Sequence, residues 1–392
     1  MSEWSTVALK DIAEINPRES IKKGDIAVKV AMDKLQPFCR DIPEIEYEVF
    51  SGGTKFRNGD TIMARITPCL ENGKTAMVNV LDDGQVGFGS TEYIVFRAKK
   101  GISDPYFLYY LVCSPMVREP AIKSMVGSSG RQRVQTDVVQ NLVLSVPPLP
   151  EQVKIGEFLK KIDDKIAVNN KINRNLSEQA FAIFEEEYQS FSTAKIGELP
   201  IVVTDYVANG SFKSLKDNVT ILEEKEYAYF IRNVDLKAKT FPRFVNQHSY
   251  EFLRKSRLEG GEVIISNVGD VGSVFLCPVL DGPMTLGNNM IMLNTEKHNS
   301  YLYLYFKSHI GQGMIAGITG GSAQPKFNKT DFKSLEIKYP NDDQVEAFNR
   351  KVKNLLDMIE KNDQENKKLE ELRDRLLPKL MSGELDVSEL EI

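Results

Sequence analysis

The chain has 392 residues, of which 42% are hydrophobic and 27% are charged. This composition is ordinary for a soluble globular protein, and it excludes wholesale disorder and a collagen-like chain. Lys and Arg number 50 against 55 Asp and Glu, so the net charge is −5 and no strongly basic composition points to nucleic acid. A chain of this length is expected to form two or three domains.

Targeting and metal-binding signals are missing from the sequence. The N-terminus has no basic start followed by an apolar stretch, and no apolar run reaches the roughly 18 residues that a membrane-spanning helix needs. The four cysteines are scattered without a CxxC pair, and no two of the three histidines have metal-ligand spacing. We therefore expect a cytoplasmic protein with reduced cysteines and no metal site.

Residues 1–148 are predicted to form a first globular domain. Strand-like runs alternate there with Gly, Asn, Asp and Pro, and Tyr106–Leu111 is a short helix candidate. The predicted strands are Lys29–Met32, Thr61–Ile66, Thr75–Val80, Tyr93–Arg97 and Leu142–Val146.

Residues 149–192 are predicted to form one long helix. The prolines just before it are interpreted as a stiff stop. Apolar residues then recur at gaps of four and three, which places one stripe along the helix. Two positions in the middle of the stripe are the polar Asn169 and Asn173. The full stripe is Ile155, Leu159, Ile162, Ile166, Asn169, Asn173, Leu176, Ala180 and Ile183.

Residues 193–339 and 340–392 repeat this plan as a second globule and a second long helix with a C-terminal tail. Adding 193 to each position of the first stripe gives the second stripe, and the polar positions become Asn362 and Asn366. A match in both phase and polar interruption indicates an internal duplication. The strands predicted in the second globule are Tyr229–Val234, Glu262–Asn267, Gly272–Leu276, Asn289–Leu293 and Leu335–Tyr339.

A helix about 50–60 Å long with an apolar stripe needs a partner along its whole length. We expect the two helices to pair with each other in an antiparallel coiled coil. Asn169 and Asn173 would then lie opposite Asn362 and Asn366, either buried and fixing the register or solvated at the edge of the stripe. The predicted fold is α+β: two similar β-rich globules with short helices, separated by the helical pair and related by a pseudo-twofold repeat.

Catalytic motifs are also missing. The sequence contains no Asn/Asp-Pro-Pro-aromatic motif of an amino-methyltransferase, no phosphate-binding P-loop and no strand–turn–helix nucleophile. Glu365 and Lys367 have the spacing of a metal-dependent nuclease, but we interpret them as part of a solvated helix face. We therefore expect a non-catalytic protein.

Two glycine-rich loops at corresponding places, residues 127–133 and 320–326, are candidate ligand sites. The backbone of such loops approaches phosphates closely, cationic side chains neutralise them, and amide side chains can read adenine. Ordinary loop surface is the alternative for any single residue. The candidate contacts on or beside polar turns are Arg57, Arg65, Lys74, Arg131, Gln132, Arg133, Arg232, Asn267, Gln324, Lys326, Asn328 and Lys329, with Asn233, Asn288 and Asn289 on similar turns.

At this point the organisation resembles the specificity subunit of type I restriction-modification systems. Pro147–Gln152 and the first helical stripe are similar to the central conserved region of that family. Leu372–Leu385 resembles its distal conserved region and is the more specific match. The second helix departs from the pattern, because it opens with Tyr339–Gln344 in place of Pro-Pro-x-Pro-Glu-Gln.

The resemblance implies a division of labour within a complex. Each globule would be a target recognition domain that reads one half of a split double-stranded DNA sequence in the major groove. The helical pair would set the spacing and dock two methylation subunits. S-adenosylmethionine, ATP and Mg would act in the partner subunits, including two motor-nuclease subunits in a complex that cleaves, and this chain would hold no cofactor.

Two alternatives to DNA recognition follow from the sequence. The chain could be a coiled-coil scaffold that presents two globules to protein ligands, or an enzyme whose site forms between the globules. A scaffold predicts no DNA affinity, whereas a DNA reader predicts binding that salt weakens. Residues 340–392 carry 9 basic and 14 acidic side chains, which favours a protein-facing role for the helices.

Overall fold

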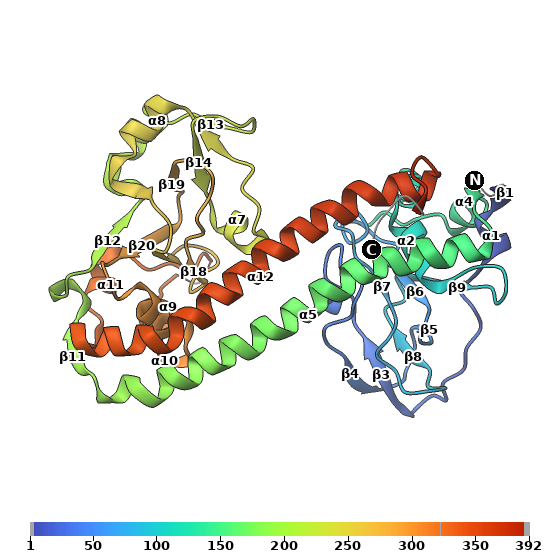
Figure 1. Ribbon diagram of the computed structural model, residues 1–392, viewed down its shortest axis with the longest axis horizontal. Coiled ribbons are helices and arrows are strands. Elements are labelled where there is room, and N and C mark those ends of the chain that lie inside the picture. Colours follow the sequence, from blue (N-terminus) through green and yellow to red (C-terminus); the bar gives the residue numbers. More distant parts are fainter. Residues whose placement is uncertain (1–3, 322, 388–392) are drawn as a thin grey trace. The chain divides into compact units, whose positions relative to one another are not determined.

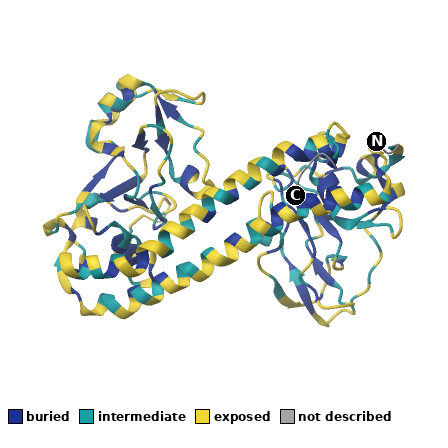
Figure 2. Ribbon diagram, in the orientation of Figure 1, coloured by how far each residue is buried: buried dark blue, intermediate teal, exposed yellow. Residues whose placement is uncertain are grey.

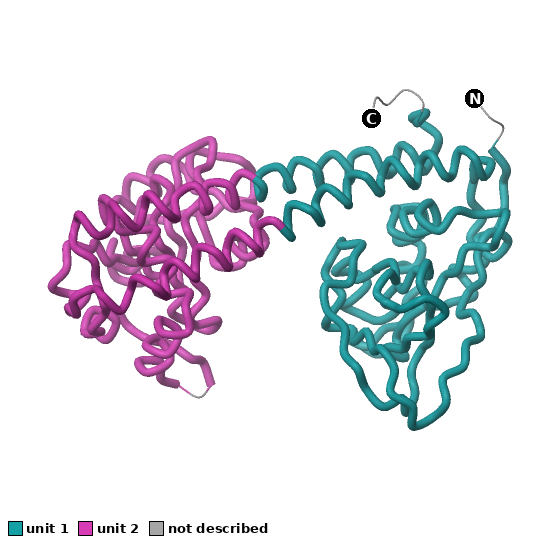
Figure 3. Tube along the Cα trace, turned by 60° about the horizontal axis from the view of Figure 1, so that its bottom comes forward, with its two compact units in different colours: residues 1–171, 362–392 teal, residues 172–361 magenta. Residues whose placement is uncertain are grey.

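The structure is a computed structural model that describes residues 4–321 and 323–387 (Figure 1). It divides into two compact units, residues 1–171 with 362–392 and residues 172–361 (Figure 3). We call them unit 1 and unit 2 and describe each by itself. No helix within the described ranges is both long enough and apolar enough to cross a membrane.

The described strands of unit 1 form two four-stranded sheets and one two-stranded ribbon. They are β1 Ser5–Ala8, β2 Ala13–Ile15, β3 Ile26–Val30, β4 Glu46–Val49, β5 Thr54–Phe56, β6 Thr61–Ala64, β7 Thr75–Met77, β8 Gly87–Gly89, β9 Tyr93–Ala98 and β10 Val143–Val146. One sheet has the order β2-β9-β6-β7 and is antiparallel throughout. The other has the order β4-β3-β8-β5 and contains a parallel pair, β3 with β8. The ribbon pairs β1 with β10.

Unit 2 repeats this topology with one strand added, because its second sheet has five described strands where that of unit 1 has four. Its strands are β11 Ser192–Lys195, β12 Val202–Asp205, β13 Ile221–Leu222, β14 Ala228–Ile231, β15 Phe244–Val245, β16 Arg257–Leu258, β17 Val263–Ser266, β18 Val274–Leu276, β19 Met284–Leu286, β20 Met290–Asn294 and β21 Glu336–Tyr339. The sheet orders are β12-β20-β17-β18 and β13-β15-β14-β19-β16, with β11 paired to β21. Again one pair is parallel, β14 with β19. The internal duplication predicted from the helices therefore extends through the sheets.

Each unit also contains short helices, and unit 2 has more of them among the described residues. Those of unit 1 are α1 Leu9–Ile12, α2 Pro105–Cys113, α3 Pro115–Lys123 and α4 Thr136–Gln140; those of unit 2 are α6 Phe212–Asn218, α7 Asn233–Ala238, α8 Gln247–Phe252, α9 Asn299–Lys307, α10 His309–Ile318 and α11 Lys329–Lys333. Single 3-10 turns are η1 Met32–Lys34, η2 Tyr188–Ser190, η3 Ile196–Glu198, η4 Tyr206–Asn209 and η5 Arg254–Ser256. The carboxylate of Asp104 accepts a 2.8 Å hydrogen bond from the N–H of Phe107, which fixes the start of α2. The helix predicted at 106–111 is confirmed as α2.

The two long helices are α5 Leu149–Glu187 and α12 Asp342–Ser382, as the apolar stripes predicted. Every predicted stripe position is buried or half-buried, and Figure 2 shows buried and exposed residues alternating along both helices. Each helix contributes to both units. The residues that α5 and α12 bury in the core are Ile155, Phe158, Leu159, Ile162, Leu376, Leu377, Leu380 and Met381 in unit 1, and Ala180, Phe184, Val345, Phe348 and Val352 in unit 2.

Contacts inside each unit show that the two helices run antiparallel. In unit 1, Asp163 bonds to Arg373 while Asn169, further along α5, bonds to Asn366, further back along α12. In unit 2, Lys351 of α12 pairs with Glu187 near the end of α5. Knobs-into-holes packing of a coiled coil stays a prediction.

The four asparagines lie within the stripe. Asn169 is 1% exposed, and its Nδ2 donates to Oδ1 of Asn366 at 2.9 Å. Nδ2 of Asn173 donates to the backbone oxygen of Ile359 at 3.5 Å, and Asn362 is 9% exposed. Buried amides that bond across two helices favour one register over the others. This geometry supports a register role for the four asparagines, which stays a prediction.

A buried polar network joins the globule of unit 1 to both helices. The Asp163 carboxylate, 6% exposed, accepts hydrogen bonds from the Tyr110 hydroxyl at 2.6 Å and from Nη1 of Arg373 at 2.9 Å. Burial, followed by the nearby Asp163 carboxylate, raises the pKa of Tyr110, which keeps this hydroxyl a donor. The positions 193 residues away in the repeat, Leu356 and Ala180, belong to the apolar core of unit 2. The same packing position is therefore polar in one unit and apolar in the other.

This difference generates a stability prediction. Asp163→Leu leaves the buried Arg373 without its main partner and should lower the free energy of unfolding by about 3–5 kcal/mol. A triple variant, Asp163→Leu with Arg373→Ala and Tyr110→Phe, copies the apolar pair of unit 2 and removes every stranded polar group. Chemical denaturation should show that the triple variant regains most of the free energy of unfolding that Asp163→Leu loses. A triple variant as unstable as the sum of its single variants would contradict this interpretation.

Candidate nucleic-acid interface

The two glycine-rich loops fold into short arms that are closed by the same backbone bonds. Arm 1, Val126–Arg133, is closed by N–H···O bonds of 3.0 and 2.8 Å between its end residues. Arm 2, Gly320–Lys326, is closed by two such bonds of 2.9 Å, and its Ser322 lies outside the described residues. Gly127 and Gly321 have φ values of +136° and +92°, which favour glycine at the first turn of each arm.

Each arm also lies against the loop that follows the corresponding central strand. The N–H of Thr67, after β6, donates to the carbonyl of Gln132 at 3.0 Å. The N–H of Gly269, after β17, donates to the carbonyl of Pro325 at 2.8 Å. The two predicted loops thus have one backbone design, as their matched positions in the sequence indicated.

Two predicted contact residues, Arg65 and Asn267, hold the bases of these arms. Nη2 of Arg65 donates to the carbonyl of Val134 at 3.2 Å, and Nδ2 of Asn267 donates to the carbonyl of Phe327 at 3.2 Å. Both residues come directly after their central strand, β6 or β17. Different side chains therefore make the same anchoring bond in the two units. A DNA contact by either residue stays a prediction.

The exposed part of arm 1 is cationic, with one ion pair at its base. Arg133 holds the carboxylate of Glu92 through Nε at 2.9 and 3.0 Å and through Nη2 at 2.7 Å. The Arg133 hydrogen bonds lower the pKa of Glu92, so this carboxylate stays charged at neutral pH. Arg131 is exposed and Gln132 half-buried, and neither side chain bonds to another of the described residues.

Arm 2 carries Gln324 and Lys326, both exposed and without side-chain partners in the described part of the chain. The predicted contacts just beyond it are engaged within unit 2. Oδ1 of Asn328 caps α11 by accepting from the N–H of Asp331 at 2.8 Å. Nζ of Lys329 pairs with Oδ1 of Asp205 at 2.8 Å.

The remaining predicted residues are also paired inside their units. Arg57 and Arg65 flank β6 at opposite ends, so Arg57 is not part of the arm site, and its Nη2 pairs with Glu19 at 2.7 Å. Nζ of Lys74 donates to the carbonyl of Met32 at 2.8 Å. Arg232, at the end of β14, pairs with Asp235 at 2.6 Å. The structure gathers Arg65, Arg131, Gln132 and Arg133 at arm 1, and Asn267, Gln324 and Lys326 at arm 2.

Sequence reasoning missed Glu92, which stands beside arm 1. It follows β8, a strand with the sequence Gly-Phe-Gly that carries no strand signal of its own. Glu92 also comes directly before β9, and the antiparallel pairing of β9 with β6 places it opposite Arg65, at the base of arm 1. This strand pairing was the missing signal, and it becomes visible only once the fold is known.

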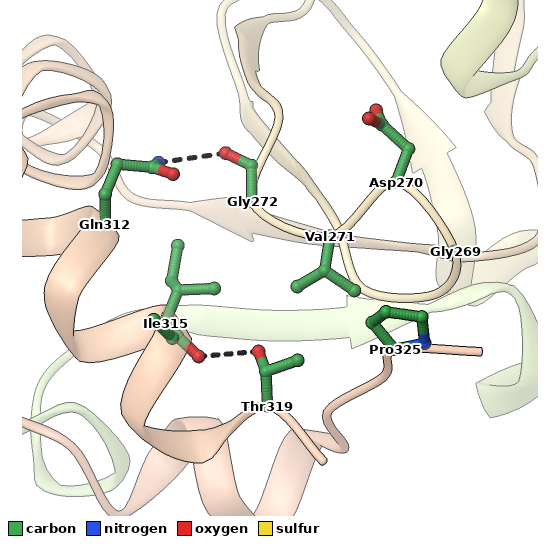
Figure 4. A pocket seen from close by; sticks show the side chains of 9 residues that line it. Gly269, Asp270, Val271, Gly272, Gln312, Ile315, Thr319 and Pro325 are labelled. Carbon is green, nitrogen blue, oxygen red and sulfur yellow. Dashed lines mark hydrogen bonds between the residues drawn. The ribbon is translucent and has the colours of Figure 1, made fainter. Parts of the chain in front are cut away.

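Unit 2 has a cavity of about 390 Å³ beside arm 2, between the loop after β17 and α10 (Figure 4). Nε2 of Gln312 closes one side by donating to the carbonyl of Gly272 at 2.9 Å. The carboxylate of Asp270, at the rim, accepts from Asn233, Ser273 and Lys237, which lowers its pKa to about 2. The lining residues are Gly269, Asp270, Val271, Gly272, Gln312, Ile315, Ala316, Thr319 and Pro325.

The corresponding loop of unit 1 is built differently. It connects β6 to β7, is longer, and buries Leu70 completely in the core against α3. Arg118 of α3 donates to the backbone oxygen of Glu71 at 2.7 Å on this loop, as Gln312 does to Gly272 in unit 2. Around the shared arm, the two units therefore present different surroundings.

Comparison with known proteins identifies the family. Residues 1–178 and 222–373 match the family model described as the type I restriction modification DNA specificity domain. The chain belongs to this family. The resemblance seen in the sequence is thereby confirmed, and so is the prediction of a specificity subunit in place of an enzyme.

The chain matches specificity subunits of other organisms along nearly the whole length of both sequences. The putative type I restriction enzyme MjaX specificity subunit of Methanocaldococcus jannaschii is 24% identical, covering 98% of this chain and 94% of the relative. The HindI specificity subunit of Haemophilus influenzae is also 24% identical, covering 98% and 100%. A crystal structure of a type I restriction-modification S subunit from M. genitalium has a TM-score of 0.54 at 16% identity, covering 97% and 96% of the two chains. This likeness supports the predicted α+β fold.

Anchoring of the arms can be tested by proteolysis. Arg65→Ala removes one hydrogen bond, worth about 1 kcal/mol, and should raise the open population of arm 1 about fivefold. Trypsin cleavage after Arg131 should accelerate accordingly, while cleavage after Lys326 in arm 2 stays unchanged. Asn267→Ala is the matched variant and should give the reverse pattern. Equal acceleration in both arms, or none, would contradict separate anchoring.

Proposed function

We propose that this chain reads a bipartite DNA sequence for a type I restriction-modification complex, one half-site for each unit. Membership in the specificity-domain family supports this role. The observation that carries it is the pair of arms: one backbone design, closed by equivalent bonds, bears Arg131-Gln132-Arg133 in unit 1 and Gln324-Pro325-Lys326 in unit 2. A constant scaffold with variable exposed side chains is what two readers of different sequences require.

The arms have the chemistry that DNA contact needs. Arg131 and Lys326 are exposed cations without an acidic partner among the described residues, so they can neutralise phosphates at no cost in broken ion pairs. Gln132 and Gln324 beside them carry amides that can donate to and accept from adenine in the major groove. The other predicted contacts are engaged within their units, so we assign them a secondary role at the interface.

We further propose that the long helices set the spacing of the half-sites and dock two methylation subunits. Each helix continues through residues of both units, which supports a function as a spacer. Exposed apolar side chains lie on the helices, Val168 at 52%, Ile172 at 42% and Met358 at 45% exposure. Apolar side chains on an acidic helix fit a protein partner better than they fit phosphates.

Catalysis in this proposal belongs to the partner subunits. S-adenosylmethionine would act in the methylation subunits, and ATP and Mg in the motor-nuclease subunits of a complex that cleaves. The names of the relatives as specificity subunits support this assignment. The scaffold alternative, with protein ligands and no DNA, has no observation of its own in its favour.

The arm residues give the first functional prediction. Arg131→Ala or Lys326→Ala should weaken DNA binding by the complex several-fold and lower the salt dependence, the slope of log K against log [salt], by about one unit. Lys10→Ala is the control, because Lys10 lies on α1 beside the opposite end of β9 from arm 1. Binding measured by fluorescence anisotropy that is unchanged for both arm variants would remove the arm hypothesis.

The two long helices give the second functional prediction. Inserting four residues, about one turn or about 6 Å, into both long helices should lengthen the preferred gap between half-sites by about one to two base pairs. Methylation mapping of a host genome that carries the variant complex reports both half-sites and the gap directly. An insertion in one helix alone is the control, and it should abolish function because the stripes fall out of register. A functional double insertion that keeps the original gap would refute the spacer.

A further inference from the structure

One side chain beside each arm occupies an equivalent place but differs in chemistry. The carbonyl of Glu92 accepts from the N–H of Arg65 at 2.9 Å, and the carbonyl of Asn289 accepts from the N–H of Asn267 at 3.0 Å. Glu92 follows β8 and Asn289 follows β19, the corresponding strand of unit 2. Arg65 and Asn267 are the two arm anchors. Glu92 and Asn289 therefore occupy equivalent backbone positions in the two units, each next to its arm.

Glu92 is held in a fixed orientation at the surface. The Arg133 guanidinium grips both carboxylate oxygens, and the Glu92 and Arg133 side chains remain 24% and 46% exposed. A carboxylate held in this way loses little conformational freedom when it meets a ligand. It keeps lone pairs that Arg133 does not use, because an ionised carboxylate can accept about four hydrogen bonds.

Stability alone does not account for a carboxylate at this place. A partly exposed ion pair contributes little to folding. Beside a cationic arm that meets phosphates, a negative charge opposes binding to every DNA sequence. An ionised carboxylate is an acceptor only, and in the major groove it fits the N4 amino group of cytosine, which is a donor.

We propose that Glu92, oriented by Arg133, is a specificity-determining residue that accepts a hydrogen bond from a cytosine amino group in the half-site read by unit 1. This inference rests on the proposed function and deepens it. Asn289 is the equivalent residue of unit 2. It is exposed, has φ of +63°, and has no side-chain partner among the residues that the structure describes. An amide at this place both donates and accepts, which fits adenine through N6 and N7.

The test uses the full chain assembled with its methylation subunit and a library of duplexes randomised in both half-sites. The half-site whose base preference changes in Gln132→Ala is assigned to unit 1, and the half-site whose base preference changes in Gln324→Ala is assigned to unit 2. Glu92→Gln replaces the acceptor by an amide of the same size. At one position of the first half-site, preference for cytosine should fall about tenfold or more and shift toward adenine, while the second half-site stays unchanged.

Asn289→Asp is the reciprocal variant, and it should shift one position of the second half-site from adenine toward cytosine. Arg133→Lys keeps the positive charge but loses the two-point grip, so it should weaken the discrimination attributed to Glu92 without changing the base that is preferred.

The outcomes separate the two levels of the proposal. If Glu92→Gln raises affinity for all sequences equally and leaves the base preference intact, Glu92 only neutralises Arg133 and the inference is overturned. A first half-site without any required C·G pair overturns it as well. If the wild-type complex shows no sequence preference in either half-site, the proposed function itself fails.

Discussion

The structure depends on one constraint: the apolar stripes of the two long helices cannot be buried by either globule alone. Each unit closes its core with the start of one helix and the end of the other, so Leu159 and Leu380 share a core, as Phe184 and Phe348 do. Burial of apolar surface is the main driving force of folding. Here it brings the start of one long helix and the end of the other into the core of each unit. The sheets, the arms and their anchors are all positioned from these cores.

Part of this arrangement was predictable from the sequence because it is periodic. A stripe that recurs every three to four residues over about eight turns specifies a helix whatever it packs against, and the helices at 149–187 and 342–382 were anticipated for that reason. The strand around Thr61–Ala64 was similarly visible from its β-branched and apolar run. β8 was not, since two of its three residues are glycines and its place is set entirely by pairing with β3 and β5.

The candidate site was predictable as loops but not as individual contacts. Matching glycines marked both arms, because a left-handed backbone turn has a residue requirement that the sequence displays. The sequence contains no comparable signal for the partner of a charged side chain. Lys329 and Arg232 are cationic side chains of the kind that contact phosphates. In the structure, however, Lys329 pairs with Asp205 and Arg232 pairs with Asp235. Arg373 sits in an apolar stripe, and only the fold reveals that it pairs there with Asp163, which also accepts a hydrogen bond from Tyr110.

Division of the helices between the units has a consequence for how the protein is made. Unit 2 is one uninterrupted stretch, residues 172–361, whereas unit 1 is completed only by residues 362–387, far along the chain. On the ribosome the first globule emerges long before the segment that covers its apolar helix face. Unit 2 therefore has all its parts first and unit 1 is completed last, so a premature stop codon in the second helix would leave the core of unit 1 open.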